Sequence, residues 1–397
     1  MTDHRGRRVV VVGGGIAGLA TGLALARTGH DTVILERQSG AAAAGPSGGW
    51  HLWSNAVQAL AILGVDERVR RHGAHLERSE FITASGRPIA AWPIGEIGRR
   101  INATDVGISR GELQRILREE YRRLVGPAGL RAGATVAGVD SGRGCLQVRE
   151  QDGSLHRADV VVGADGIRST VRTGIAGAVA PRYAGYVQWQ AVLPRSAAPA
   201  TVLTPGTELV VFGRRARAVI HDVGDGQVFW AAILYGPPTL PTAADPRTLL
   251  LGSFAGFPEP LIALIEATAD SAITAHAIYD LPPQRHWSRT ATVLVGDAAH
   301  AMTTNLSQGA CLALEDAVVL ADCLGSASST SGIPAALSAY EQRRKQRAQP
   351  VARRSRRIAG LGGWRGVPAV ALRNQLMRMT LPSVALRDHE RFVTTAP

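Results

Sequence analysis

Residues 9–37 constrain the fold of this 397-residue chain more than any other stretch. The β-branched run at 9–12, VVVV, predicts a strand buried on both faces of a parallel sheet. Gly13, Gly15 and Gly18 follow with GxGxxG spacing, which permits a tight turn, close approach of a pyrophosphate to the backbone, and close packing of helix on strand. Helically spaced apolar residues and a second strand-like run come next. The segment therefore predicts the strand, turn, helix and strand of a dinucleotide-binding Rossmann unit.

Glu36 ends the second predicted strand, 18 residues after Gly18. A carboxylate at this place can accept hydrogen bonds from both hydroxyls of an adenosine ribose, and it would repel a phosphate there. The motif does not choose between FAD and NAD. A structural glycine turn is the alternative interpretation, because glycine is abundant in this chain.

The composition sets limits on the class of protein. A hydrophobic content of 45% supports a substantial core, and the chain has no run of about 20 apolar residues. We therefore expect no stable membrane insertion, and the lack of a signal-peptide pattern predicts a cytoplasmic protein. Cys145, Cys311 and Cys323 lack CxxC spacing and are expected to be reduced thiols, which argues against a disulfide reductase.

The formal net charge of +12 raises the question of an acidic partner. Nearly all of the positive charge is arginine, with Lys345 as the single lysine. The densest cluster, residues 343–357, has no interleaved aromatic side chains, which favours a solvated helix face. No nucleic-acid partner is expected. A nucleotide-binding module that contacts nucleic acid or an anionic membrane through this cluster is the alternative.

A second motif lies far along the chain. The strand-like run ATVLV ends in Gly296-Asp297, and a loop then leads to an apolar helix that starts near Gly309. The carboxylate of Asp297 can hold a polyol hydroxyl. The free backbone N–H groups of Gly309 and Ala310 can face negative charge, such as that of a reduced flavin.

Five segments in this order resemble the FAD-dependent aromatic hydroxylases, the single-component flavoprotein monooxygenases that include salicylate hydroxylase, p-hydroxybenzoate hydroxylase, urate hydroxylase and zeaxanthin epoxidase. The segments are GGGIAGLATGLALARTGHDTVILER, ISRGELQRIL, VVGADGIRSTVR, LVGDAAHAM and QGACLALEDAVVLADCL. The resemblance implies FAD as bound cofactor and NADH or NADPH as transient reductant, which agrees with the absence of a second GxGxxG. It implies hydroxylation of an aromatic or polycyclic, largely apolar small molecule by O2 through a flavin C4a-hydroperoxide, in a monomer or homodimer.

The implied fold is α/β: a Rossmann-like FAD-binding domain, an inserted and mainly antiparallel β-sheet substrate domain, and a C-terminal helical segment. We expect the FAD-binding domain at 1–174, with an excursion of strands near 80–108, and its return at 286–330. The substrate-covering sheet, marked by alternating apolar residues, is expected at 175–285. The helical region is expected at 331–397.

The resemblance also implies roles for single residues. Arg110 would contact the ribityl or phosphate region of FAD, Val136 would lie by the adenine, and Asp165 would serve FAD and NAD(P)H together. The predicted cofactor-binding set is Gly13, Gly14, Gly15, Ile16, Ala17, Gly18, Glu36, Arg37, Gly49, Arg110, Val136, Asp165, Asp297, Gly309 and Ala310. The predicted substrate pocket is lined by Tyr186, Gln188, Trp189, Phe212 and Trp230. Ordinary packing within the sheet is the alternative for each of these five.

The family pattern is broken after GDAAHAM. Thr304 stands where the family has a proline, and Ser307 where it has the first glycine of Gly-Gln-Gly. A flavin-dependent epoxidase, oxidase or dehydrogenase on the same fold is therefore the alternative function.

Histidines at two places in the chain are candidates for catalysis or metal binding. His51 in GGWHLW is the candidate catalytic base for a phenol, with a packed or solvated histidine as the alternative. His72 and His75 have metal-like spacing without a convincing third ligand, so no metal site is expected.

Overall fold

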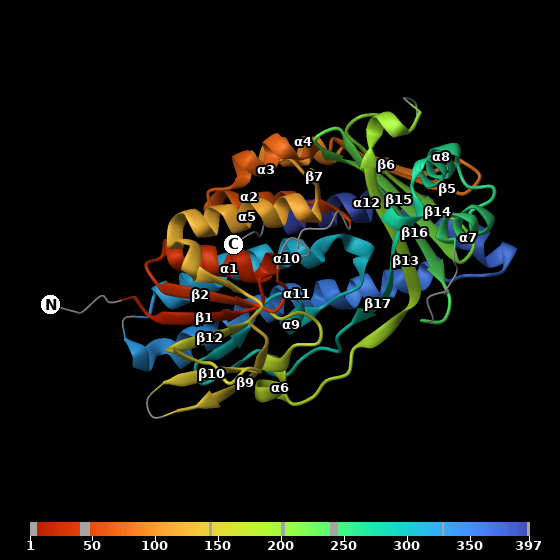
Figure 1. The fold of residues 1–397 in the computed structure, drawn as a ribbon. Helices are drawn as coiled ribbons and strands as arrows, with labels where there is room; N and C mark the ends of the chain where they lie inside the picture. Colours follow the sequence, from red (N-terminus) through yellow and green to blue (C-terminus); the bar gives the residue numbers. More distant parts are fainter. Residues whose placement is uncertain are drawn as a thin grey trace.

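The computed structural model describes residues 6–39, 48–142, 145–199, 203–238, 245–327 and 329–394. Two large sheets dominate it, one mainly parallel and flanked by helices, the other mainly antiparallel (Figure 1). The long helix α11 (Ile333–Gly362) passes from the first sheet toward the second (Figure 1). The predicted helical C-terminal region is confirmed as α11 and α12 (Val367–Thr394). In the part of the chain that the structure describes, no helix is both long and apolar enough to cross a membrane.

The first sheet has the strand order β18-β19-β12-β1-β2-β8, and all of its pairs except β18 with β19 are parallel. Its strands are β1 (Arg8–Val12), β2 (Asp31–Glu36), β8 (Leu130–Ala132), β12 (Val160–Gly163), β18 (Ser288–Arg289) and β19 (Thr292–Leu294). Residues 9–12 are buried, as the β-branched run predicts. Because β1, β12 and β19 are neighbours, the segments that follow these three strands meet at one edge of the sheet.

Helices cover this sheet. The main ones are α1 (Ile16–Arg27), α5 (Arg110–Val125) and α10 (Gln308–Gly325), and α1 packs against both of the others. Ser109 caps α5, since its hydroxyl accepts a hydrogen bond from the Glu112 N–H. Shorter helices are α2 (Ser54–Ile62), α3 (Asp66–His72), α4 (Ile94–Arg100), α6 (Thr170–Ala176) and α9 (Asp297–His300).

Two small sheets complete this half of the molecule. One contains β3 (Gly49–Leu52), β4 (Ala74–His75) and β7 (Val106–Ser109). The other contains β9 (Val136–Ser141), β10 (Leu146–Glu150) and β11 (Leu155–Ala158).

The second large sheet has the order β17-β13-β16-β15-β14-β5-β6. Its strands are β5 (Arg78–Thr83), β6 (Pro88–Trp92), β13 (Arg182–Pro194), β14 (Thr207–Phe212), β15 (Ala216–Gly224), β16 (Gln227–Tyr235) and β17 (Thr274–Asp280). All pairs are antiparallel except β14 with β5. The sheet thus takes strands from both sides of residue 174, because the predicted excursion near 80–108 supplies β5 and β6.

The two faces of this sheet have different neighbours. Residues paired directly across strands point to the same face. One row runs from Trp189 through Ala232 and Ala218 to Val211, and it packs in a hydrophobic cluster with α7 (Pro246–Ser253) and α8 (Glu259–Ala267). The opposite face packs on α11 and on the first half of the molecule, as the contact of Tyr186 with Thr304 shows.

Candidate active site

The glycine loop after β1 is shaped to admit a ligand. A Cβ atom on Gly13, whose φ is +106°, would lie 2.4 Å from the Ala164 carbonyl oxygen, and one on Gly18 would lie 1.8 Å from the Gly13 oxygen. Both positions therefore require glycine. A Cβ on Gly15 would meet nothing within 4 Å, so the backbone opens onto free space just before Ile16, the first residue of α1. The long helix behind this open loop provides the N-terminus that favours a pyrophosphate.

Glu36 closes one side of the loop. Its Oε2 accepts a 2.6 Å hydrogen bond from the Gly14 N–H, and Oε1 accepts one of 2.8 Å from Gln38. The Ala134 N–H donates to the Glu36 carbonyl, which brings Val136 close to the end of β2. Arg37 follows and is exposed. This arrangement fits an adenosine site.

The second motif meets the first in space. A Cβ on Gly296 would lie 2.7 Å from the Cβ of Ala17 in α1 and 3.3 Å from that of Ala313 in α10. Asp297 is accessible to solvent at this junction, yet desolvation by the surrounding protein raises the pKa of its carboxyl. The charges of His300 and Arg110 lower the same pKa.

Asp165 takes part mainly in backbone structure. Its carboxylate accepts hydrogen bonds from the Ser169 hydroxyl and from the N–H groups of Thr170 and Val171 at the start of α6. The motif still borders the loop, since the Cβ position of Gly13 is only 3.1 Å from the Asp165 Cα. The contact of Asp165 with FAD and NAD(P)H stays a prediction, and in the structure its carboxylate caps α6 beside the glycine loop.

The N-terminus of α10 faces the same junction. Ser307 precedes it with φ 52° and provides no side-chain cap to the helix. The N–H groups of the first turn, which include those of Gly309 and Ala310, therefore have no side-chain acceptor at the cap. Gly49 pairs with Ser109, next to Arg110, and its Cβ position is 2.5 Å from Phe229, so this glycine also lets β3 approach the second large sheet.

Gln114 is a residue that sequence reasoning missed. Its Nε2 donates a 3.0 Å hydrogen bond to the Gly14 carbonyl, and the side chain is buried. It lies one turn after Arg110 on α5, and that spacing was the available signal. An open glycine loop, a carboxylate at the end of β2, an accessible aspartate and an uncapped helix N-terminus thus surround one space, and this set fits FAD.

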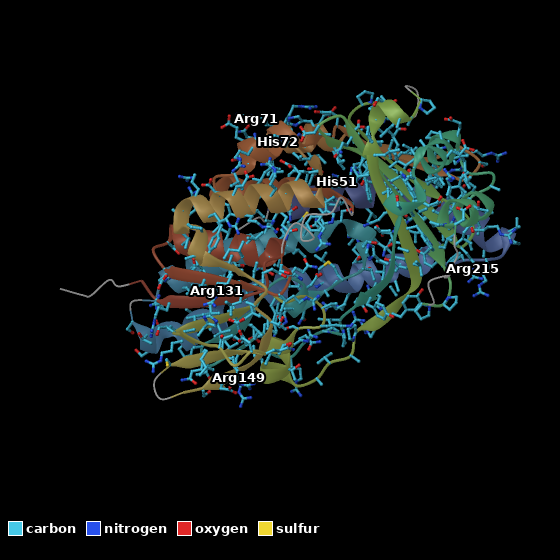
Figure 2. All side chains as sticks on the ribbon, viewed as in Figure 1. His51, Arg71, His72, Arg131, Arg149 and Arg215 are labelled. Atoms are coloured by element: carbon cyan, nitrogen blue, oxygen red, sulfur yellow. The ribbon has the colours of Figure 1, made fainter. Side chains whose placement is uncertain are left out.

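His51 is wrong as a candidate base. Its ring is buried in the interior (Figure 2), with Nε2 2.8 Å from Asp105 Oδ2 and Nδ1 3.0 Å from Glu208 Oε1. Burial disfavours the charged ring, but the carboxylates of Glu208 and Asp105 outweigh it and raise the pKa of His51 to about 10. The ring is therefore an imidazolium at neutral pH, with no free lone pair for a substrate proton.

His72 has a different environment, near the surface (Figure 2). His72, Glu112 and Asp225 form the one group, among the residues with described structure, whose possible metal-ligand atoms all lie within 4.8 Å of one another. His75 is not part of it and contacts the Thr104 hydroxyl instead. The Asp225 side chain is exposed, and exposed groups of this kind are ordinary surface features.

Two of the predicted substrate residues meet the unusual loop after α9. The Tyr186 hydroxyl lies 3.2 Å from Thr304 Oγ1 and accepts a hydrogen bond from Asn305 Nδ2. Thr304 Oγ1 donates to Gln188 Oε1 at 3.1 Å. Thr304, which replaces the family's proline, thus ties η5 (Thr304–Leu306) to β13.

The five predicted substrate residues fall on both faces of the sheet, so they do not form one pocket. Tyr186, Gln188 and Phe212 share the face toward α11. Trp189 and Trp230 lie on the opposite face in the core with α7 and α8, and the Trp230 indole donates to Thr268. The period of two in a strand explains the separation, because Gln188 and Trp189 must point in opposite directions.

Arg217 is a second residue that sequence reasoning missed. Register places it on the face of Gln188, since Gln188 pairs with Ile233, Ile233 with Arg217, and Arg217 with Phe212. It is only 5% exposed, its Nε has no hydrogen-bond partner, and it forms no ion pair within the described residues. A charged residue within the apolar alternation ARAVIHDV was the signal for it. A buried cation without a partner is ready to receive an anion.

Comparisons with known proteins agree with this geometry. A family model described as "FAD binding domain" matches residues 7–220 and 272–355. The chain is 38% identical to aurachin C monooxygenase/isomerase of Stigmatella aurantiaca, over 94% of each protein. It is 32% identical to chloroplastic zeaxanthin epoxidase of Nicotiana plumbaginifolia, over 86% of this chain and 53% of that protein.

The fold also matches a solved relative. The crystal structure of Klebsiella pneumoniae HpxO complexed with FAD and uric acid superposes with a TM-score of 0.89 at 25% identity, covering 100% of this chain and 98% of that one. The resemblance inferred from the five motifs is therefore confirmed. The chain is an enzyme that belongs to the FAD-dependent monooxygenases built on this FAD-binding domain.

Proposed function

We propose that this enzyme uses NADH or NADPH and O2 to hydroxylate an aromatic or heteroaromatic small molecule. The substrate carries an anionic group or another strong hydrogen-bond acceptor. The observation that carries the proposal is Arg217, a buried guanidinium without a carboxylate partner on the sheet face that points toward α11. Burial of an unpaired charge is costly, and a substrate anion would offset that cost.

The surroundings of Arg217 support a flat substrate. The rings of Tyr186 and Tyr235 lie 5.2 Å apart on the same face, and the Tyr235 hydroxyl has no hydrogen-bond partner in the described structure. Gln188 lies in the row of paired residues that contains Arg217, because both pair with Ile233. Aromatic walls with a few polar groups are typical of sites that orient a planar ligand.

The protein and the cofactor divide the chemistry. Bound FAD would take electrons from the nicotinamide and activate O2, which is the source of the oxygen atom that is transferred. Asp297 and Arg110 would hold the polyol and phosphate region, and the α10 N-terminus would stabilise negative charge on the reduced ring system. Arg217 orients the substrate, and the buried sheet face excludes water.

Epoxidation is the second candidate reaction. The similarity to zeaxanthin epoxidase favours it, as does the replacement of the family's proline by Thr304 and of its first glycine by Ser307. Both reactions insert one atom of O2, so the product distinguishes them.

The test begins with the purified protein, which should be yellow or should become yellow when FAD is added. NADH and NADPH oxidation are then followed with a panel of aromatic acids, phenols and hydroxyquinolines, under ¹⁸O2, with mass spectrometry of the products. We expect a stimulating compound to gain one labelled oxygen as a hydroxyl group. A labelled epoxide would favour the second candidate, whereas hydrogen peroxide without labelled product would overturn both.

A further inference from the structure

A cavity lies between α11 and the segment that links β17 to β18. Its volume is about 450 Å³, within the range of small-molecule sites. None of the predicted FAD or substrate residues lines it. Its walls come from Arg182, from residues 280–287, from the end of α9, and from residues 349–357 of α11.

The walls carry excess positive charge. Arg182, Arg353, Arg356 and Arg357 line the cavity, and Asp280 is its one acidic residue. Asp280 accepts hydrogen bonds from both Arg182 and Arg356. Arg353 and Arg357 form no ion pair with any described residue and are exposed at the rim. Four guanidinium groups therefore face one carboxylate.

Two residues that line the cavity each have a buried polar atom without a partner among the described residues. Trp287 is completely buried, and its indole Nε1–H has no hydrogen-bond partner among the described residues. His300 is 5% exposed, and its Nε2 is bound 2.6 Å from Asp316 Oδ2 while Nδ1 has no partner. Buried polar groups in native proteins are almost always satisfied. Both residues line the cavity with other parts of their side chains, while these two atoms themselves are closed off from solvent.

We propose that this cavity binds a phosphate-bearing small molecule, with the phosphate between Arg353 and Arg357 and its organic group toward Trp287. Arginine forks match phosphate oxygens in geometry and charge. The volume exceeds that of a single phosphate, and the buried indole offers a flat wall to an organic group. Inorganic phosphate and a nucleotide monophosphate share the recognised chemistry, and the test separates them.

The binding test uses isothermal titration calorimetry on the FAD-loaded protein at low ionic strength, with inorganic phosphate and with adenosine 2′-monophosphate as probes. We expect Arg353→Gln/Arg357→Gln to weaken binding by roughly 10- to 100-fold, because two charge-assisted contacts are lost. Arg365→Gln is the matched control: Arg365 is an exposed arginine just after α11 that does not line the cavity. Binding of both probes would assign the site to phosphate itself, and binding of the nucleotide alone would assign it to a phosphate ester.

A second measurement follows Trp287, which lines the cavity, by NMR. The chain has seven tryptophans, and Trp287→Phe identifies the indole N–H signal of Trp287 by its disappearance from the amide and indole NMR spectrum. We expect that signal to shift on titration with the probe that binds, because Trp287 lines the cavity, while flavin absorbance stays constant. Absence of binding, or binding that the double variant and Arg365→Gln weaken equally, would overturn the proposal. Because neither measurement uses turnover, its failure is distinct from a failure of the proposed hydroxylation.

Discussion

His51 and Arg217 are two buried cations beside the same strand, and they differ in whether the protein neutralises them. His51 contacts Glu208 near the start of β14, and Arg217 pairs in register with Phe212 at its end. Two carboxylates surround His51, whereas Arg217 has no carboxylate among the described residues. The difference separates a structural cation from one that is available to a ligand.

The His51 cluster joins parts of the fold. His51 belongs to β3, Glu208 belongs to β14, and the second oxygen of Glu208 accepts from the Ser79 hydroxyl of β5. Asp105 also accepts from the backbone and hydroxyl of Ser54 at the start of α2. These bonds fix one half of the molecule against the other, and they leave His51 without a catalytic proton site.

The largest effect is expected when the neutralised cation is removed. His51→Leu leaves two buried carboxylates without their cation and should lower the free energy of unfolding by about 3–5 kcal/mol, measured by urea denaturation of the FAD-loaded protein. His72→Leu is the control. Its half-exposed ring contacts Asp225 at 3.2 Å, and its loss should cost less than about 1 kcal/mol.

The pH dependence sharpens this result. The pKa of His51 is raised to about 10 from an ordinary value of 6.5, so its stabilisation is complete below pH 6.5 and is lost as the pH rises through 10. His51 lowers the pKa of Glu208 to about 2 despite burial, so that contribution is complete above pH 4.5 and is lost as the pH falls through 2. The stability difference between wild type and His51→Leu should therefore narrow toward pH 10. An unchanged difference at that pH would contradict a charged His51.

Removal of the unpaired cation should damage activity and leave stability intact. Arg217→Met should reduce kcat/KM for an anionic substrate by roughly 30- to 1000-fold, or about 2–4 kcal/mol, since a charge-assisted contact is lost. FAD content should not change, and the unfolding free energy should stay equal or rise, because a buried charge is gone. Arg214→Met, an exposed neighbour before β15, should keep normal kinetics. Equal losses in both variants would contradict a substrate contact at Arg217.

A smaller effect is expected at the loop that contacts the substrate face. Thr304→Pro restores the family residue. The backbone conformation suits proline because Thr304 begins η5 after an extended Thr303, but the change removes the Thr304 N–H, which donates to the Tyr186 hydroxyl at 3.4 Å. The variant loses the hydroxyl contacts to Tyr186 and Gln188, so we expect a loss of about 1–2 kcal/mol in stability and a several-fold higher KM. Thr304→Val separates the hydroxyl from the backbone. If Thr304→Val matches wild type, those hydrogen bonds contribute nothing.

The smallest expected effect is a gain in stability at Ser307. Ser307 has φ 52°, a left-handed conformation that glycine adopts without strain. Ser307→Gly should raise the free energy of unfolding by up to about 1 kcal/mol, measured by thermal and urea denaturation, while Ser307→Ala should not. A gain in both variants would show that the backbone at this position is not strained.

Much of the cofactor half was predictable from local pattern. The glycines at 13 and 18, the run at 9–12 and Glu36 each carry a short-range requirement: backbone crowding, burial on two faces, or a carboxylate at a strand end. The motif that ends in Asp297 was predictable for the same reason. Gln114 was harder, because its hydrogen bond to Gly14 crosses 100 residues of chain.

The sequence by itself determined the Rossmann unit, its ligand class and the order in which the two large sheets follow along the chain. These features depend on spacing within single segments. Only the tertiary structure decided which face of a strand meets the ligand space. Trp189 and Trp230, predicted to line the substrate pocket, lie on the opposite face in the core with α7 and α8. It also decided the ionisation of His51 and the isolation of Arg217, because the pKa and the solvation of a charge depend on neighbours brought together from distant parts of the chain.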